Sequence, residues 1–190
     1  MNGSMVRPIL NRNKKGVPKN KVLVTAGGGG QPSAEIFFNL IGKAIDKVAP
    51  DYDVDFTVLL GAYNTNDVGP FPKTKIKRWT HDMPAEYREA RFVISEAGFF
   101  TVHELLEHNK PAILIPGARN IDNQELRAVT WELEGCGYCV LPDSQADTLE
   151  DKMRHMLNGK AAEFSGRCKS LFDRAGKFPS VIDKILAKIS

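Results

Sequence analysis

Three stretches of the sequence are rich in glycine or amide side chains, and each follows a short apolar run. The first is a run of four glycines from Gly27 to Gly30. Glycine lets the backbone approach a ligand closely and turn its amide N–H groups toward an anion. The stretch lacks the Lys-Ser/Thr pair of a P-loop, which argues against a Walker-type NTPase. It indicates either a ligand-binding turn or a flexible connection without a ligand.

The second stretch covers residues 95–101 (SEAGFFT) and opens a helix that carries Glu104. Unpaired N–H groups and the positive end of a helix dipole favour an anion there, each such interaction contributing about 0.3–1 kcal/mol. Thr101 and Glu104 also have the spacing of a capping box, in which the two side chains only satisfy their own backbone. On the local pattern alone, both interpretations stay open.

The third stretch covers residues 116–124 (PGARNIDNQ) and places amides and a carboxylate ahead of another helix. Side chains of these types can form hydrogen bonds with the hydroxyls of a sugar. The alternative is that Asp122 is the N-cap of that helix and its neighbours are solvated.

An alternating series of strands and helices must position these stretches. We expect strands over residues 21–26, 55–61, 74–79, 92–95, 111–115 and 138–141, and helices over residues 33–48, 84–90, 101–108, 121–134, 149–157, 162–172 and 181–189. This alternation predicts an α/β fold, a doubly wound (Rossmann-like) parallel sheet with helices on both faces. Such sheets bind ligands outside the carboxyl ends of their strands.

Length and composition limit the domain organisation and the partners. The 190 residues have room for one domain, which we place at 21–190, after a polar leader or linker at 1–20. The formal net charge is only +3, and the basic stretch from Lys14 to Lys21 contains no aromatic residue, so we expect no nucleic-acid partner. No apolar run is long enough to span a bilayer and the N-terminus has no secretory pattern, which predicts a cytoplasmic protein.

The cysteines and histidines are weaker candidates for chemistry. Three cysteines suit a reducing compartment, and the pair Cys136 and Cys139 leads into a strand without a second pair. We therefore expect buried apolar thiols, with Cys168 as the third, and no metal site. His81 and His103 are expected to be surface or supporting residues rather than catalysts.

Four segments, in one order and at one set of spacings, resemble the C-terminal domain of glycosyltransferase family 28, the MurG-like group with the GT-B fold. They are residues 79–87 (WTHDMPAEY), 93–105 (VISEAGFFTVHEL), 110–116 (KPAILIP) and 122–128 (DNQELRA). The resemblance covers roughly residues 20–160. It implies that the chain is the donor-binding half of a GT-B fold and holds a UDP-sugar, usually UDP-GlcNAc, in cell-envelope or glycan biosynthesis.

The resemblance also implies a role for each turn. Glu104 would accept hydrogen bonds from the ribose hydroxyls. The diphosphate would be held by the amides of Gly98, Phe99, Phe100 and Thr101, together with the Thr101 hydroxyl. Trp79 would lie beside the uracil, and the backbone of Thr80 would contact the edge of the base. Asn123 and Gln124 would contact the donor sugar, and Gly27, Gly28 and Gly29 would face the diphosphate or the acceptor.

Three residues depart from the pattern of the family. Glu96 stands where members often have Arg, which replaces a cation near the phosphates with an anion. Either Glu96 points away, or another cation such as Arg119 acts in its place. Arg127 stands where members commonly have Asn, and Arg91 where they commonly have Asp. These changes bear on how the phosphates and the donor sugar are held.

The resemblance implies an inverting N-acetylglucosaminyl transferase that uses no cofactor and no divalent metal. The acceptor site and the general base would lie in an N-terminal domain or a partner subunit, through which the chain would associate peripherally with the cytoplasmic face of a membrane. We expect the isolated chain to be inactive or weakly active. The alternatives are a nucleotide-sugar hydrolase, with His81 or His103 as its base, and a non-catalytic nucleotide-sugar-binding module.

Overall fold

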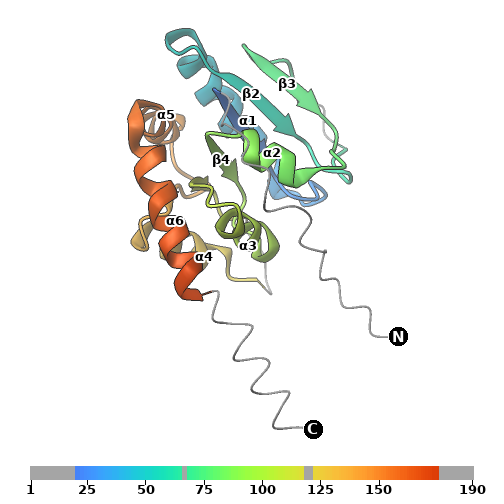
Figure 1. Ribbon diagram of the computed structural model, residues 1–190. Helices are drawn as coiled ribbons and strands as arrows, with labels where there is room; N and C mark the ends of the chain where they lie inside the picture. Colours follow the sequence, from blue (N-terminus) through green and yellow to red (C-terminus); the bar gives the residue numbers. More distant parts are fainter. Residues whose placement is uncertain (1–19, 66–67, 118–121, 176–190) are drawn as a thin grey trace, which may run out of the picture.

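The computed structural model describes residues 20–65, 68–117 and 122–175, and these contain a six-stranded sheet in which every strand is parallel to its neighbours (Figure 1). The strands are β1 (Lys21–Thr25), β2 (Asp55–Leu59), β3 (Thr74–Lys77), β4 (Phe92–Ser95), β5 (Ala112–Leu114) and β6 (Gly137–Cys139). Their order in the sheet is β3-β2-β1-β4-β5-β6. The order reverses direction between β1 and β4, which confirms the doubly wound, Rossmann-like topology.

The helices alternate with the strands. They are α1 (Ser33–Val48), α2 (Met83–Glu89), α3 (Phe99–Glu107), α4 (Gln124–Leu133), α5 (Ala146–His155) and α6 (Ala161–Ala175), with short helical segments η1 (Ala49–Asp51) and η2 (Met156–Lys160). None of the helices in the described ranges has the length and apolarity needed to cross a membrane. The leader expected before Asn20 and the helix expected at 181–189 lie outside the described residues.

Two hydrophobic cores hold the helices against opposite faces of the sheet. In β1, the side chains of Val22 and Val24 pack into the core beneath α1 and α5, whereas Leu23 packs into the core beneath α2, α3, α4 and α6. This alternation follows from the two-residue period of a strand. Full burial of such a side chain contributes about 1.5–3 kcal/mol. Because both faces are covered, the ends of the strands are where a ligand can reach the sheet.

Of the described helices only α1 starts at the expected residue, and the shifts of α3 and α4 concern the candidate site. Helix α3 starts at Phe99 rather than Thr101, with Gly98 as its N-cap. Helix α4 starts at Gln124, and its N-cap is Asn123, whose side chain accepts a hydrogen bond of 2.9 Å from the amide of Leu126. The interpretation of Asp122 as an N-cap is therefore wrong, because its carboxylate pairs with Arg127 instead.

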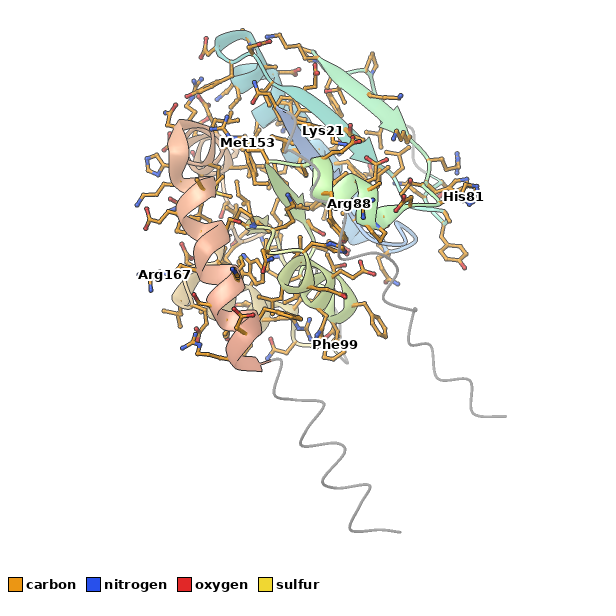
Figure 2. All side chains as sticks on the ribbon, viewed as in Figure 1. Lys21, His81, Arg88, Phe99, Met153 and Arg167 are labelled. Carbon is orange, nitrogen blue, oxygen red and sulfur yellow. The ribbon has the colours of Figure 1, made fainter. Side chains whose placement is uncertain are left out.

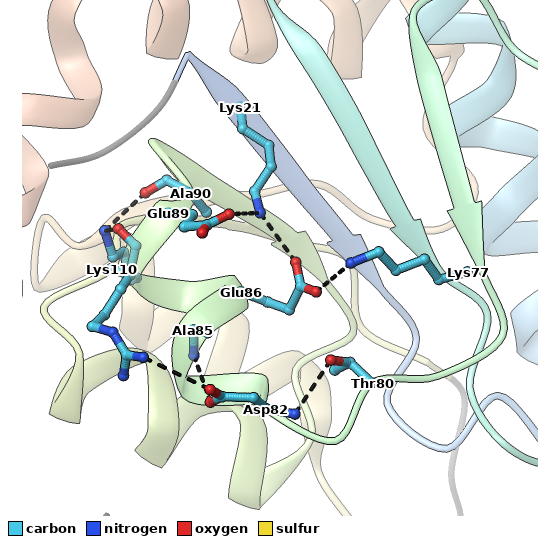
Figure 3. A network of polar contacts seen from close by, with 10 residues as sticks. Lys21, Lys77, Thr80, Asp82, Ala85, Glu86, Glu89, Ala90 and Lys110 are labelled. Carbon is cyan, nitrogen blue, oxygen red and sulfur yellow. Dashed lines mark hydrogen bonds and ion pairs between the residues drawn. The ribbon is translucent and has the colours of Figure 1, made fainter. Parts of the chain in front are cut away.

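A buried polar network fastens α2 to the sheet (Figure 3). The carboxylate of Glu86 accepts a hydrogen bond of 3.0 Å from Lys21 of β1 and one of 2.5 Å from Lys77 of β3. Lys21 also pairs with Glu89 at 3.1 Å. Burial opposes ionisation of Glu86, but the hydrogen bonds from the two lysines outweigh it and hold the pKa of Glu86 below its usual value.

Lys110 secures the C-terminal turn of α2. Its ammonium group donates hydrogen bonds of 3.2 and 2.8 Å to the carbonyl oxygens of Arg88 and Ala90. These carbonyls belong to the last turn, where a helix leaves its C=O groups without intrahelical partners. Burial, with a smaller effect from the charge of Lys21, lowers the pKa of Lys110 to about 8. The position of α2 is thus fixed at its middle, through Glu86, and at its C-terminal turn.

Candidate functional site

The candidate residues lie at the carboxyl ends of four strands. The glycine run follows β1, Trp79 and Thr80 follow β3, the Glu96–Gly98 turn follows β4, and Asn123 and Gln124 come after β5. Because all the strands are parallel, these turns lie at the same edge of the sheet. Figure 2 shows His81 beyond the end of β3 and Phe99 at the start of α3.

The glycine run packs tightly against the loop that follows β2. Gly29 has φ +70°, and a Cβ there would lie 2.0 Å from the carbonyl oxygen of Leu60. Gly61 has φ +94°, and a Cβ there would lie 2.4 Å from the carbonyl carbon of Gly28. Gly27 also has positive φ, +62°, but it is exposed and a Cβ would meet nothing. Gly29 and Gly61 are therefore required by packing, whereas Gly27 has open space in front of it.

The start of α3 differs from the start of every other α-helix in the described residues. Helices α1, α2, α4, α5 and α6 each have an acidic residue in the first turn, and α3 has none. The N-cap of α3 is Gly98, which has no side chain to satisfy the first amides. Its positive end is thus neither neutralised nor capped by its own residues, which makes it an anion-binding position.

The capping-box interpretation of Thr101 and Glu104 is wrong. Thr101 lies inside the first turn of α3 rather than at its N-cap. The Oε2 atom of Glu104 accepts a hydrogen bond of 3.0 Å from the hydroxyl of Tyr87, which is 1% exposed. Tyr87 belongs to α2 and is a supporting residue that the sequence analysis missed, since an aromatic residue in a short helix gives no sign of its partner.

Trp79 presents an aromatic surface at the end of β3. Its side chain is 51% exposed, and its ring lies edge-on to that of His81 with centroids 4.0 Å apart. The preceding residue, Arg78, donates a hydrogen bond of 2.8 Å to the carbonyl oxygen of Asn64, which anchors the chain there. The Thr80 hydroxyl accepts a hydrogen bond of 3.3 Å from the amide of Asp82. About half of the Trp79 side chain is thus accessible to a ligand.

Gln124 is buried beside the end of β5. It is 1% exposed, and its Oε1 accepts a hydrogen bond of 2.9 Å from the amide of Gly117. Its Nε2 is buried and has no acceptor among the described residues. An unsatisfied buried donor costs about 1–3 kcal/mol, so an incoming oxygen acceptor would remove that penalty. The oxygen of its neighbour Asn123 is already used to cap α4.

Glu96 is directed toward the start of α1. It is 4% exposed, and its Oε1 accepts a hydrogen bond of 2.8 Å from the hydroxyl of Ser33, the first residue of α1. A carboxylate is favoured near the positive end of a helix. Glu96 therefore has a structural role at α1, whereas Arg119, the substitute cation considered above, lies outside the described residues.

Arg127 brings a cation to the start of α3 from α4. Its Nη1 donates a hydrogen bond of 2.5 Å to the carbonyl oxygen of Ala97, and its Nη2 pairs with Asp122 at 2.5 Å. The guanidinium carbon lies 5.8 Å from the centroid of the Phe99 ring. From the sequence, Arg127 stands out only as a departure from the family, because Asp122 precedes the N-cap of α4 and a pair five residues apart is not a recognised helical pairing.

Arg91 lies away from the candidate site at the carboxyl edge of the sheet. It lies at the amino end of β4, where it donates hydrogen bonds of 2.7 Å to the carbonyl oxygen of Leu157 and 3.3 Å to Oδ1 of Asn20. The expectation that Arg91 affects the phosphate or sugar contacts is wrong, since the turns lie at the opposite end of the strand.

The thiols match the expectation of structural residues. Cys136 and Cys168 are fully buried, and the Cys168 thiol donates to the carbonyl oxygen of Cys136 at 3.7 Å. Cys139 is half-buried, and burial together with nearby carboxylates raises its pKa to about 11, which keeps the thiol protonated. Over the described ranges, no three His, Cys, Asp or Glu side chains are grouped to hold a metal ion. His81 and His103 are both exposed, as expected of surface residues.

A doubly wound parallel sheet with these turns at its carboxyl edge defines a Rossmann-like domain of the kind that forms one half of a GT-B glycosyltransferase. The chain belongs to glycosyltransferase family 28, whose C-terminal-domain model matches residues 22–184. The chain is thus a glycosyltransferase C-terminal domain of the MurG-like group.

Curated relatives agree with this family. The chain is 28% identical over 156 residues to the UDP-N-acetylglucosamine--N-acetylmuramyl-(pentapeptide) pyrophosphoryl-undecaprenol N-acetylglucosamine transferase of Caldicellulosiruptor saccharolyticus, covering 75% of this chain and 41% of that enzyme. It is also 28% identical over 160 residues to the enzyme of the same name from Prochlorococcus marinus, covering 80% of this chain and 42% of the enzyme. The chain therefore spans about two fifths of the length of these relatives.

Solved structures support the fold. MurG of Acinetobacter baumannii superposes with a TM-score of 0.67 at 16% identity, over 82% of this chain and 46% of that one. The spinosyn forosaminyltransferase SpnP superposes with a TM-score of 0.69 at 13% identity, over 90% of this chain and 45% of that one. At these identities the likeness concerns the fold alone, and in each case it extends over less than half of the glycosyltransferase.

Proposed function

We propose that the chain binds the donor of an inverting glycosyltransferase and that this donor is a UDP-sugar, with UDP-GlcNAc as the first candidate. The observation that carries the proposal is the start of α3, where a glycine N-cap and a first turn without acidic residues leave the helix ready for an anion. The transferases named among the relatives use UDP-N-acetylglucosamine, which suggests the nucleotide.

The neighbouring turns supply contacts for the rest of such a donor. The diphosphate would accept hydrogen bonds from the amides of Gly98 to Thr101, and the Thr101 hydroxyl would add another. The carboxylate of Glu104, held by Tyr87, would accept hydrogen bonds from the two ribose hydroxyls. A carboxylate has two oxygens and can accept about four hydrogen bonds, so it can hold two vicinal hydroxyls at once.

The two ends of the donor would lie at opposite sides of α3. The uracil would stack on the exposed face of Trp79, a contact of the type that contributes about 1–3 kcal/mol. The sugar would lie near Asn123 and Gln124, where the buried Nε2 of Gln124 offers a hydrogen-bond donor to a sugar oxygen. Gly27, at the open end of the glycine run, would face the diphosphate or the acceptor.

In the proposed reaction an acceptor hydroxyl loses its proton to a base and attacks the anomeric carbon, while the bond from that carbon to the diphosphate oxygen breaks. Negative charge grows on the departing UDP. The amides and dipole of α3 stabilise that charge in place of a divalent metal. The base and the acceptor site would come from an N-terminal domain or a partner subunit, which would also provide any association with a membrane.

Isothermal titration of the purified chain with UDP, UDP-GlcNAc, UDP-glucose and dTDP-glucose tests the proposal. We expect UDP and UDP-GlcNAc to bind and dTDP-glucose to bind at least tenfold more weakly. The absence of binding by UDP and by every UDP-sugar would overturn the proposal.

An activity assay separates the proposal from its alternatives. Release of free sugar and UDP by the chain alone would indicate a hydrolase, and loss of that activity on replacing His81 or His103 would identify its base. Sugar transfer that requires an added acceptor-binding domain supports the proposed transferase. Binding without transfer in the presence of that domain would indicate a non-catalytic module.

A further inference from the structure

Arg127 joins the two turns that the proposed function assigns to the diphosphate and to the donor sugar. Its Nη1 donates a hydrogen bond of 2.5 Å to the carbonyl oxygen of Ala97, the residue directly before the N-cap of α3. Its Nη2 donates one of 2.5 Å to Oδ1 of Asp122, the residue directly before the N-cap of α4. A single guanidinium group therefore ties the start of α3 to the start of α4.

The contact with Ala97 determines the direction of an amide at the phosphate turn. The carbonyl of Ala97 and the N–H of Gly98 belong to one trans peptide group, in which the two bonds point in opposite directions. Because Arg127 holds the carbonyl oxygen, it also fixes where the N–H of Gly98 points. Gly98 has no side chain that could restrict this peptide by other means, so the contact from α4 takes that role.

The contact with Asp122 acts on the other turn. Asp122 directly precedes Asn123, which caps α4. The next residue is Gln124, whose side-chain oxygen Oε1 accepts a hydrogen bond from the amide of Gly117. The side chains of Arg127 and Asp122 are 23% and 30% exposed, so their pair is partly shielded from water. A partly buried pair with a fixed geometry is a firmer connection than an exposed ion pair.

We infer that Arg127 is a positioning residue that couples the phosphate-binding turn to the sugar-binding turn, with Asp122 as its fixed partner. The inference rests on the proposed function and extends it, because it concerns how one part of the donor is held relative to another. Arg127 contacts neither Trp79 nor Glu104, where the proposed function places the base and the ribose. Loss of Arg127 should therefore weaken binding of the diphosphate–sugar part of the donor more than binding of the nucleoside.

The chemistry of arginine suits this role. Its planar guanidinium presents donors in two directions, so one group can hold a carbonyl oxygen and a carboxylate at once. The ring of Phe99 lies 5.8 Å from the guanidinium carbon, within the range of a cation–π contact. A lysine has one compact ammonium on a flexible stem and would not reproduce both contacts with fixed geometry.

The test compares the affinities of UMP, UDP and UDP-GlcNAc for the wild-type chain and for R127M, R127K, D122N and the double variant D122N/R127M. Arg174→Met is the matched control, because it removes an exposed ion pair between Arg174 of α6 and Glu134 at the end of α4. Melting temperatures are measured for every variant. We expect R127M to weaken the binding of UDP-GlcNAc about tenfold and the binding of UMP less than about threefold. R127K should resemble R127M, and D122N should act in the same direction.

The double variant shows whether the two residues act as one unit. If they do, D122N/R127M should bind UDP-GlcNAc within about twofold of R127M alone. Equal weakening of UMP and UDP-GlcNAc, a lower melting temperature with unchanged relative affinities, or no change at all would each overturn the coupling. A wild-type chain that binds none of the three ligands would instead overturn the proposed function, and the coupling with it.

Discussion

The hydroxyl of Tyr87 donates a hydrogen bond of 3.0 Å to Oε2 of Glu104, which joins α2 to α3 at the candidate site. Tyr87 is fixed in turn, because its helix is held by Lys21 and Lys77 through Glu86 and by Lys110 at its last turn. The carboxylate proposed to bind the ribose thus takes its position from a buried network on the face of the sheet. A supporting arrangement of this kind is what a binding group needs to keep its geometry.

Replacement of Glu104 should remove the proposed ribose contact. We expect Glu104→Ala to weaken UDP binding more than tenfold, or more than about 1.4 kcal/mol. Tyr87→Phe should weaken it only a few-fold and lower the free energy of unfolding by about 0.5–1.5 kcal/mol, because one hydrogen bond is lost while the carboxylate remains. Calorimetry and urea unfolding measure the two effects. Unchanged UDP binding by Glu104→Ala would exclude the ribose role.

A negative charge placed in the first turn of α3 should have opposite effects on stability and binding. Phe100 is 70% exposed, so Phe100→Asp adds a charge without disturbing the core. The helix dipole should make the free protein about 0.3–1 kcal/mol more stable than Phe100→Asn, the matched neutral variant. UDP should bind to the Asp variant about fivefold more weakly than to the Asn variant, through charge repulsion.

The dependence on salt provides the check on this prediction. Added salt screens the repulsion, so the difference in affinity between the Asp and Asn variants should shrink as ionic strength rises. If the two variants bind UDP equally at low salt, the diphosphate does not lie at the start of α3.

Alanine substitutions in the glycine run separate the effect of a steric clash from the effect of backbone conformation. A Cβ at Gly29 would clash with the carbonyl oxygen of Leu60, whereas one at Gly27 would meet nothing, and both have positive φ. We expect Gly27→Ala to lower the free energy of unfolding by about 1–2 kcal/mol, because of the backbone conformation alone. Gly29→Ala should cost about 2–4 kcal/mol, because the backbone must also shift. Urea unfolding measures both. Equal losses of stability would contradict the tight packing of the glycine run against the loop that follows β2.

The ion network under α2 should appear in the acid dependence of stability. The lysines hold the pKa of Glu86 below its usual value, so the folded state binds its proton less readily than the unfolded state does. Its contribution is therefore fully present above the unfolded pKa, about 4.5, and is lost as the pH falls through the lower folded pKa. Glu86→Gln should be about 1–3 kcal/mol less stable at pH 7, with a smaller further loss in acid. Parallel pH profiles for the two proteins would contradict this.

The topology was predictable because its signals are local. The alternation of apolar runs and helical patterns gave six strands and the helices of the described residues, with ends displaced by a few residues. Three of the four turns could be found for the same reason, since glycine and amide residues after a strand mark a turn. The turn with Trp79 and Thr80 was found only through the resemblance to the family. The orientation of side chains across the sheet has no such signal. Tyr87 and Glu104 are paired only because α2 and α3 pack side by side.

The departures from the family were harder to interpret without the structure. Glu96 and Arg127 looked like changes at one phosphate site, but Glu96 is directed toward Ser33 at the start of α1 and Arg127 toward Ala97 at the start of α3. Arg91 was a third departure from the family, but it lies at the amino end of β4, away from these turns. The sequence gives each residue a position on its strand or helix, and only the packing shows which turn its side chain reaches.

The edge strand β3 has a consequence for the behaviour of the chain at high concentration. Its side chains are only partly buried, and Lys75 is exposed on it. An open edge of a sheet can pair with the same edge of another copy, and exposed lysines oppose such pairing because they repel each other. We therefore expect this edge to stay unpaired at the protein concentrations that calorimetry requires, so that it does not disturb the binding stoichiometry.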